Sequence, residues 1–274
     1  MPSLEADLER ARELDVGDLA DAVQSIGFEC TRCGACCTAH ETASGEREPH
    51  TATVFPDEIR RLTGAETDAA GEVGSGGDDG EDGDVDEGGE ADRSGGDGDG
   101  GGDAGESEGP DRSGGDESLD WRDVARPMPF GLREGSNGPE GETFEWALQV
   151  DDCGDCVFYA EEDGVGACTR HDDRPLICRT YPFSVALPGT SQPMGEPVDE
   201  EGVVRAHECE GLGRDIDRED AEELARTLKA RAVRELEEAI AVRENYEPAS
   251  PDPGSVVVHD SEGAKRPDGA PYEG

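Results

Sequence analysis

The sequence predicts an α+β protein that is mostly helical: a small irregular cysteine-cluster domain with a β-hairpin, flanked by N- and C-terminal helices and divided by a disordered acidic insertion. Three observations lead to this prediction. Apolar residues at helical spacing mark both ends of the chain, and a segment of period two marks its middle. Nine cysteines gather in two groups on either side of a long Gly- and Asp-rich segment.

The first predicted element is a helical segment over residues 3–25, interrupted near residues 15–17, because its leucines and alanines recur on one helical face. After the first cysteines, residues 53–54 predict an extended piece. Residues 56–63 then predict a short helix that has proline in its first turn and Gly64 as its C-terminal stop.

The segment 65–118 holds 20 acidic and 2 basic residues and hardly any apolar ones. Such a segment cannot bury enough apolar surface to offset the entropy of ordering, so we expect it to be disordered. We expect the same of the Pro-, Gly- and Asp-rich tail, in which residues 256–258 could form a weak strand. The predicted organisation is 1–64 (N-terminal helix and first cysteine half), 65–118 (disordered insertion), 119–246 (hairpin, second cysteine half and long helix) and 247–274 (disordered tail).

Beyond the insertion, residues 143–150 alternate apolar and polar side chains, which predicts a half-buried strand. The glycines of residues 138–141 predict the turn of a hairpin that ends in this strand. A long amphipathic helix is predicted to begin after Asp215 or Asp217 and to continue to about residue 246, with its apolar stripe forming part of the core.

The formal net charge is −45 over 274 residues, and only 2 of the 24 basic residues are lysine. An acidic, lysine-poor and aromatic-poor chain is typical of a cytoplasmic protein from a high-salt cell, where the short Debye length makes self-repulsion tolerable. The chain offers no basic patch for phosphates, which argues against nucleic-acid and anionic-membrane partners. No signal peptide or membrane span is recognisable, so we expect a cytoplasmic protein with reduced thiols.

The cysteines point to a metal. Four lie in the run Cys-Thr-Arg-Cys-Gly-Ala-Cys-Cys at residues 30–37, and five follow far downstream: Cys153, Cys156, Cys168, Cys178 and Cys209. Thiolates at every third residue can be aimed at one point, which suits zinc or an iron–sulfur cluster. Because the predicted core is thin, we expect a metal-stabilised domain in which metal binding contributes to folding.

The motifs follow in this order: Cys30-x2-Cys33-Gly34-x-Cys36-Cys37, the helix Pro-Asp-Glu-Ile-Arg-Arg-Leu at 56–62, Cys156-x-Phe158, Cys168, and Arg174-Pro175-x2-Cys178-Arg179-x-Tyr181-Pro182-Phe183. Over about residues 28–64 and 151–185, this order resembles the CxxCxxCC zinc- or iron-chelating family, also called YkgJ-type cysteine cluster proteins. The acidic insertion is not part of that family's pattern, and Cys153 and Cys209 look additional to it.

The resemblance implies seven metal ligands: Cys30, Cys33, Cys36, Cys37, Cys156, Cys168 and Cys178. Seven exceed the four thiolates of one tetrahedral zinc or one four-iron cluster, so either two centres exist or some thiols are spare. Cys153 and Cys209 are further, weaker candidates. Arg174 and Arg179 could donate to thiolates and offset the charge of a cluster, with salt bridges to carboxylates as the alternative.

Three functions follow as hypotheses. The first is a protein that holds an iron–sulfur cluster, expected to be 4Fe-4S, with a redox or electron-transfer role. The second is a structural zinc module that binds a protein partner. The third is an enzyme that resembles a protein lysine N-methylase, because a bacterial flagellin lysine N-methylase looks to carry a similar cysteine domain. We find no dinucleotide or phosphate-loop fingerprint, so catalysis stays an open question.

Overall fold

The computed structural model describes residues 3–41, 45–64, 119–136, 138–193, 197–199 and 202–274. Contacts divide the chain into two units, of which one consists of Met1–Thr67 and Ser118–Gly274. The other, Asp68–Glu117, lies outside the described residues, as does the predicted disordered insertion 65–118.

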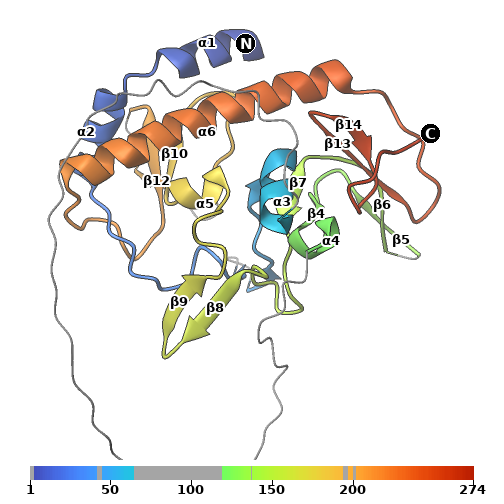
Figure 1. Cartoon of the computed structure of the whole chain (residues 1–274), viewed down its shortest axis with the longest axis horizontal. Helices are drawn as coiled ribbons and strands as arrows, with labels where there is room; N and C mark the ends of the chain where they lie inside the picture. The colour runs from blue at the N-terminus through green and yellow to red at the C-terminus, as the bar shows by residue number, and fades with distance from the viewer. Residues whose placement is uncertain (1–2, 42–44, 65–118, 137, 194–196, 200–201) are drawn as a thin grey trace, which may run out of the picture. The chain divides into compact units, whose positions relative to one another are not determined.

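One half of the described unit is built from helices that pack on a small sheet. The chain begins with α1 (Leu4–Glu13) and α2 (Val16–Ile26), and α6 (Arg218–Asn245) packs against both. The sheet has the order β10-β12-β11, with bounds Phe183–Val185, Val204–His207 and Pro197–Asp199. Figure 1 shows α6 passing above β10, β12 and the short helix α5 (Leu176–Thr180). The predicted helices and the break between them are confirmed.

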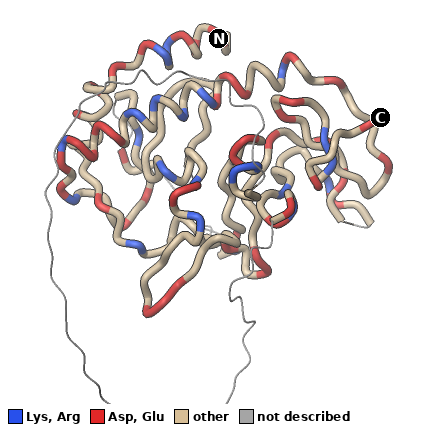
Figure 2. The backbone as a smooth tube through the Cα atoms, in the orientation of Figure 1, with Lys and Arg blue, Asp and Glu red and all other residues tan. Residues whose placement is uncertain are grey.

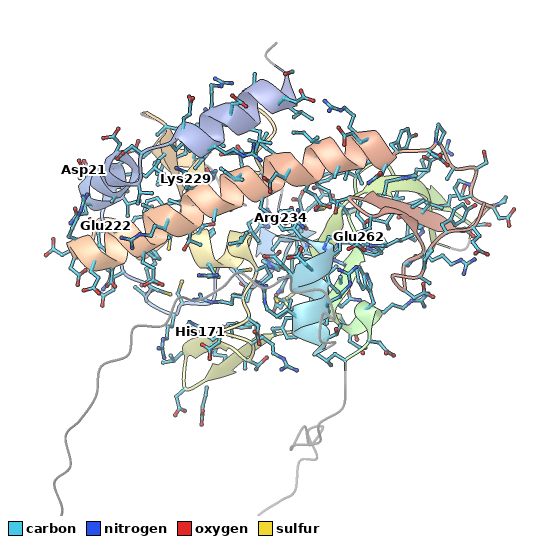
Figure 3. The ribbon with its side chains drawn as sticks, turned by 45° about the horizontal axis from the view of Figure 1, so that its top comes forward. Asp21, His171, Glu222, Lys229, Arg234 and Glu262 are labelled. Carbon is cyan, nitrogen blue, oxygen red and sulfur yellow. The ribbon has the colours of Figure 1, made fainter. Side chains whose placement is uncertain are left out.

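Apolar side chains from these elements form what we call the helical core. Its buried members are Leu8, Ala11, Leu19, Ala20, Val23, Phe183, Val185, Val204, Ala206, Ala221, Ala225, Leu228, Ala232 and Leu236. Alanines on α6 let α1 and α2 approach it closely. Polar contacts complete the packing: Lys229 Nζ donates to the carbonyl oxygen of Leu14 at 2.7 Å, and Arg218 pairs with Asp21 (Figure 3).

A second group of buried side chains forms the core of the other half of this unit, and we call it the cysteine-side core. It contains Ala52, Val54, Ile59, Leu62, Val124, Ala125, Trp146, Leu148, Cys156, Phe158 and Val258. Its sheet has the order β3-β7-β4, with bounds Thr53–Val54, Trp146–Leu148 and Ala125–Pro127. The helices α3 (Pro56–Thr63) and α4 (Trp121–Val124) pack together beside it. Gly64 ends α3 with a φ of 76°, as predicted for a left-handed stop.

The tail is the main correction to the sequence-based expectation. Residues 256–260 form β13 (Val256–Asp260), which pairs in parallel with β6 (Gly138–Phe144) and antiparallel with β14 (Gly263–Lys265). The resulting sheet has the order β14-β13-β6-β5, with β5 at Arg133–Gly135. The weak strand considered for residues 256–258 is thus present. The tail is ordered because Val257 and Val258 are fully buried and β13 pairs with a strand about 115 residues earlier in the chain, a pairing that the local sequence does not reveal.

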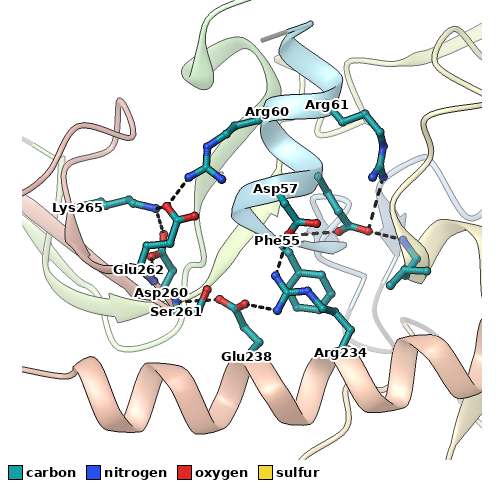
Figure 4. Close-up of polar contacts among 12 residues, drawn as sticks. Phe55, Asp57, Arg60, Arg61, Arg234, Glu238, Asp260, Ser261, Glu262 and Lys265 are labelled. Carbon is teal, nitrogen blue, oxygen red and sulfur yellow. Dashed lines mark hydrogen bonds and ion pairs between the residues drawn. The ribbon is translucent and has the colours of Figure 1, made fainter. Parts of the chain in front are cut away.

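A polar network anchors this tail. Asp260 accepts hydrogen bonds from Trp146 Nε1 at 2.8 Å and from Lys265 Nζ at 2.8 Å, and all three side chains are buried. Figure 4 shows the network continuing to α3 through the Glu262–Arg60 pair, and to α6 through Glu238. A buried ammonium is tolerated here because carboxylates surround it.

The predicted hairpin is present, with two differences. Its turn was expected at residues 138–141 but comes earlier in the chain, because Gly138 already belongs to β6 and pairs with Gly135. The predicted strand 143–150 is divided at Glu145, whose φ of 67° turns the chain between β6 and β7. A non-glycine residue in this conformation is strained, so surrounding packing imposes it.

The mixed α+β class is confirmed, but the expectation of a mostly helical protein is not, because the described residues are 32% helical and 25% strand. Acidic side chains are spread over most elements, and basic ones are fewer (Figure 2). In the part of the chain that the structure describes, no helix has the length and apolar character needed to cross a membrane.

Candidate metal centre

The first cysteine segment leaves α2 at Gly27 and is fixed at once to a distant part of the chain. Phe28 forms an isolated antiparallel bridge with Leu212, and the amide of Glu29 donates to the carbonyl oxygen of Gly211 at 3.1 Å. Gly27 has a φ of 77°, and a Cβ at this position would collide with the backbone carbonyl of Arg214. This bridge places Cys30 beside the segment that carries Cys209.

The next residues join the two cysteine halves directly. The amide of Cys156 donates to the carbonyl oxygen of Cys37 at 2.8 Å, and the amide of Gly166 donates to that of Arg32 at 2.7 Å. Gly34, with a φ of 77°, packs against the ring of Tyr159, where a Cβ would collide with the phenol. Backbone hydrogen bonds therefore hold the halves together, although residues 65–118 separate them in sequence.

Local structure positions each downstream cysteine. An isolated bridge between Val150 and Cys156 precedes the hairpin of β8 (Tyr159–Glu162) and β9 (Val165–Cys168). In that hairpin Tyr159 pairs with Cys168, which places Cys168 near Cys156. Cys178 lies on α5, which is anchored to α3 because Glu58 Oε1 accepts the amide of Leu176 at 2.8 Å.

Five thiols form what we call the inner thiol group: Cys36, Cys37, Cys156, Cys168 and Cys178. Cys156 is buried in the cysteine-side core, and Cys37, Cys168 and Cys178 pack against that core. The Sγ atoms of Cys36 and Cys37 lie 3.6 Å apart. Every pair among Cys36, Cys156, Cys168 and Cys178 lies close enough to interact electrostatically. Four thiols from three segments of the chain are thus gathered in one place.

The electrostatics of this group suit a cation. Burial raises the pKa of Cys156 to about 11 and also raises the pKa values of Cys168 and Cys178, while the adjacent thiol of Cys37 raises the pKa of Cys36. Buried thiols without a compensating charge remain protonated, whereas a bound metal cation stabilises them as thiolates. The all-sulfur donor set therefore suits zinc or iron in its chemistry, although within the described residues the donors do not converge closely enough to hold a single ion.

Three further cysteines form the outer thiol group: Cys30, Cys33 and Cys209. Cys209 interacts electrostatically with Cys33, Cys36 and Cys30, so Cys36 connects the two groups. The Sγ atom of Cys209 accepts the amide of Gly211 at 3.4 Å. Cys30 and Cys33 are exposed. The structure thus places Cys209, expected only as a weaker candidate, near the first cysteine segment. The sequence contains no signal for this proximity, because it results from the bridge between Phe28 and Leu212.

Cys153 is the cysteine that stands apart. It is exposed in a tight turn in which Asp151 Oδ1 accepts the amides of Cys153 at 2.9 Å and Asp155 at 3.0 Å. It takes part in none of the thiol contacts described for the inner and outer groups. Cys153 is therefore close to Cys156 in sequence but does not share the thiol contacts of either group.

The two predicted arginines lie beside the thiols. Arg174 Nε donates to the carbonyl oxygen of His171 at 3.0 Å, and its charge lowers the pKa values of Cys36 and Cys168 against the larger opposing effects. Arg179 is exposed and lines a cavity together with Arg174 and Cys30. Within the described residues, neither guanidinium forms an ion pair with a carboxylate. His171 itself is exposed, and its ring nitrogen Nδ1 lies 3.4 Å from Asp172 Oδ1 (Figure 3).

Two tyrosines, of which Tyr181 belongs to the motif recognised in the sequence, complete the surroundings. Tyr159 packs on Gly34, and its hydroxyl donates to Glu161 Oε2 at 2.9 Å. Tyr181 donates to the carbonyl oxygen of Glu208, one residue before Cys209, and burial raises its pKa. Within the ranges that the structure describes, no three His, Cys, Asp or Glu side chains converge closely enough to hold a single metal ion.

Residues 132–210 match the model of one protein family, described as "CxxCxxCC: Putative zinc- or iron-chelating domain". The match supports metal binding by this part of the chain and confirms the resemblance seen in its sequence. It includes Cys156, Cys168, Cys178 and Cys209, whereas the Cys30–Cys37 run lies outside it. No curated protein and no solved structure matches the chain.

Proposed function

We propose that this protein holds an iron–sulfur cluster of the 4Fe-4S type, with Cys36, Cys156, Cys168 and Cys178 as its ligands. The observation that supports the proposal is that these four thiols, which come from three separate segments, all lie within electrostatic range of one another. Four cysteine thiolates are the usual ligand set of such a cluster. When bound, the cluster would supply one-electron redox chemistry.

The surrounding residues support this assignment. The carbonyl of Cys37, the edge of the β8–β9 hairpin and the N-terminus of α5 are each fixed by backbone hydrogen bonds, so the four thiols are held on defined elements. Arg174 brings positive charge to Cys36 and Cys168, which offsets the net negative charge of a thiolate-bound cluster. Cys37 and the outer thiol group remain as ligands of a second centre or as spare thiols.

Anaerobic purification with iron, sulfide, zinc and the optical spectrum measured together tests the proposal. We expect about four iron and four sulfide per chain and a broad absorption near about 400 nm, as 4Fe-4S clusters show. The Cys178→Ser variant should lose most of the iron, while the matched control Cys153→Ser should retain it. A colourless protein with stoichiometric zinc, or equal iron loss in both variants, would overturn the assignment.

One observation favours zinc as the second candidate. The Cys36 and Cys37 Sγ atoms are 3.6 Å apart, near the edge of about 3.8 Å that a tetrahedral site has when each Zn–S bond is about 2.3 Å. A structural zinc would tie the first cysteine segment to the second half. In that case a chelator should unfold the cysteine-side core of the zinc-loaded protein without any redox signal.

We also infer that the protein works in a reducing, salt-rich cytoplasm. Cys30, Cys33 and Cys153 are exposed thiols outside the proposed ligand set, and an oxidising compartment would not preserve them. Residues 65–118 account for −18 of the net charge of −45, so about −27 remains on the rest of the chain, whose self-repulsion molar salt would screen. Thermal unfolding between about 0.1 and 2 M KCl tests this, and a midpoint that does not rise with salt would contradict it.

A further inference from the structure

A cavity of about 670 Å³ opens beside Cys30, between the loop that follows α2, the Arg174–Arg179 region and the N-terminal turns of α6. This volume falls in the range of about 300–1,000 Å³ that is usual for small-molecule sites. Neither the family match nor the proposed cluster assigns a ligand to it. Its lining has three chemically distinct parts: a basic side, an acidic side and an apolar floor.

The basic side is made by Arg174 and Arg179. In the parts of the chain that the structure describes, no carboxylate lies within 4 Å of either guanidinium, although the chain has 69 acidic and 24 basic residues. Of the 20 arginines that the structure describes, 12 form an ion pair with a carboxylate, whereas both arginines of this cavity are among those that do not. Two such guanidiniums on one cavity wall are suited to a carboxylate or phosphate group.

The acidic side is made chiefly by Asp220 and Glu223, on the first two turns of α6. Asp215 and Glu29 also line the cavity, and Glu29 is paired with Arg214 at 3.8 Å. The neighbouring Asp217 is already used, because its side chain accepts the amide of Asp220 at 2.9 Å and caps the helix. No ion pair joins Asp220 or Glu223 to a cation among the described residues, whereas the neighbouring Glu222 pairs with Arg218 and Arg226. This wall is suited to an ammonium group.

Apolar side chains form the floor between the two charged walls. Phe28, Ile216 and Leu224 line the cavity and at the same time pack against the helical core. Phe28 also packs edge-on against Phe183, with ring centroids 5.7 Å apart. The floor is therefore rigid, and it would favour a ligand with an apolar middle.

We propose that this cavity binds a small zwitterion, an amino acid or a dipeptide with apolar side chains. Its carboxylate would contact Arg174 and Arg179, and its ammonium would lie against Asp220 and Glu223. A simple anion would be repelled by the acidic wall and a simple amine by the arginines, so the two walls together select a molecule with both charges. The site adjoins Cys30 of the outer thiol group but does not depend on which metal the protein holds.

The dipeptide L-leucyl-L-leucine is a probe that matches this chemistry, and equilibrium binding by calorimetry or saturation-transfer NMR is the measurement. Two analogues each remove one charge: the N-acetyl dipeptide lacks the ammonium and the dipeptide amide lacks the carboxylate. We expect the zwitterion to bind and each analogue to bind at least tenfold more weakly. Absence of binding by the zwitterion, or equal binding of the three compounds, would overturn the proposal.

Variants locate the site. Arg179→Gln should weaken binding of the dipeptide by tenfold or more, and Glu223→Gln should do so for the zwitterion but not for the N-acetyl analogue. Arg133→Gln is the matched control, because Arg133 is also exposed but lines a different cavity on β5 and β6. Metal content is measured in each variant: unchanged metal with lost dipeptide binding supports a separate ligand site, whereas dipeptide binding that survives Arg179→Gln contradicts the assignment.

Discussion

The two cores of this protein are held together by different means. The helical core is continuous and apolar, and three helices and one small sheet enclose it, with no cysteine among its members. The cysteine-side core is assembled from strands of two to five residues and short helices, and four of its members or close neighbours are thiols. The difference indicates that the helical core folds on apolar burial, whereas the other half is built around the thiols that we propose as metal ligands.

The largest effect should come from the helical core. Phe183 is fully buried, so Phe183→Ala should lower the free energy of unfolding by about 3–5 kcal/mol. Denaturant titration measures this. Because the inner thiols belong to the other core, the folded fraction should keep its metal content; a loss of metal in proportion to stability would show that the two cores are one cooperative unit.

The buried network around Asp260 should be nearly as sensitive. Asp260→Ala leaves the Lys265 ammonium with Glu262 as its remaining partner and leaves Trp146 Nε1 unsatisfied, at a cost of about 3 kcal/mol. Tryptophan fluorescence during denaturant unfolding reports it. If the tail were not part of the folded unit, the variant would unfold at the wild-type midpoint.

Glu145 should make stability depend on pH. Burial first, and then the carboxylates of Glu235 and Glu238, raise the pKa of Glu145 from 4.5 to about 7. The folded state therefore holds this proton more tightly than the unfolded chain, so the stabilisation is complete below about pH 4.5 and is lost as pH rises to about 7. We expect a decrease on the order of 2 kcal/mol across this window.

The Glu145→Gln variant isolates that contribution, since it keeps the shape of the side chain and removes its titration. In the variant, the free energy of unfolding should no longer decrease by this amount between pH 4.5 and 7. An identical pH profile in the wild-type protein and the variant would assign the slope to other groups.

An effect on stability of similar size, with the clearest effect on metal, is expected at Gly34. Gly34→Ala meets both a φ of 77° and the ring of Tyr159, so we expect a cost of about 1–3 kcal/mol together with reduced metal content. Gly164→Ala is the matched control, because Gly164 has a φ of 78° but open space around it. Equal metal content in the two variants would show that the contact with Tyr159 does not position the thiols.

Some of these features could be read from the sequence because they depend on neighbours in the chain. The period of the apolar residues predicted α1, α2 and α6, and Pro56 with Gly64 delimited α3. The order of cysteine motifs led to the family that residues 132–210 match. The predictions of an unbroken strand over residues 143–150 and of a disordered tail were wrong. The reason is that the conformation of Glu145 and the β13–β6 pairing depend on packing between distant segments.

By itself, then, the sequence determined the helices, the acidic character and the chemistry of the thiol donors, since each of these is a property of residue type and local spacing. Tertiary structure alone decided which thiols meet. Cys209 joins Cys30 through the bridge between Phe28 and Leu212, and Cys37 joins Cys156 through one backbone hydrogen bond. The physical reason is that such contacts close loops of more than 100 residues, and the chain carries no local record of them.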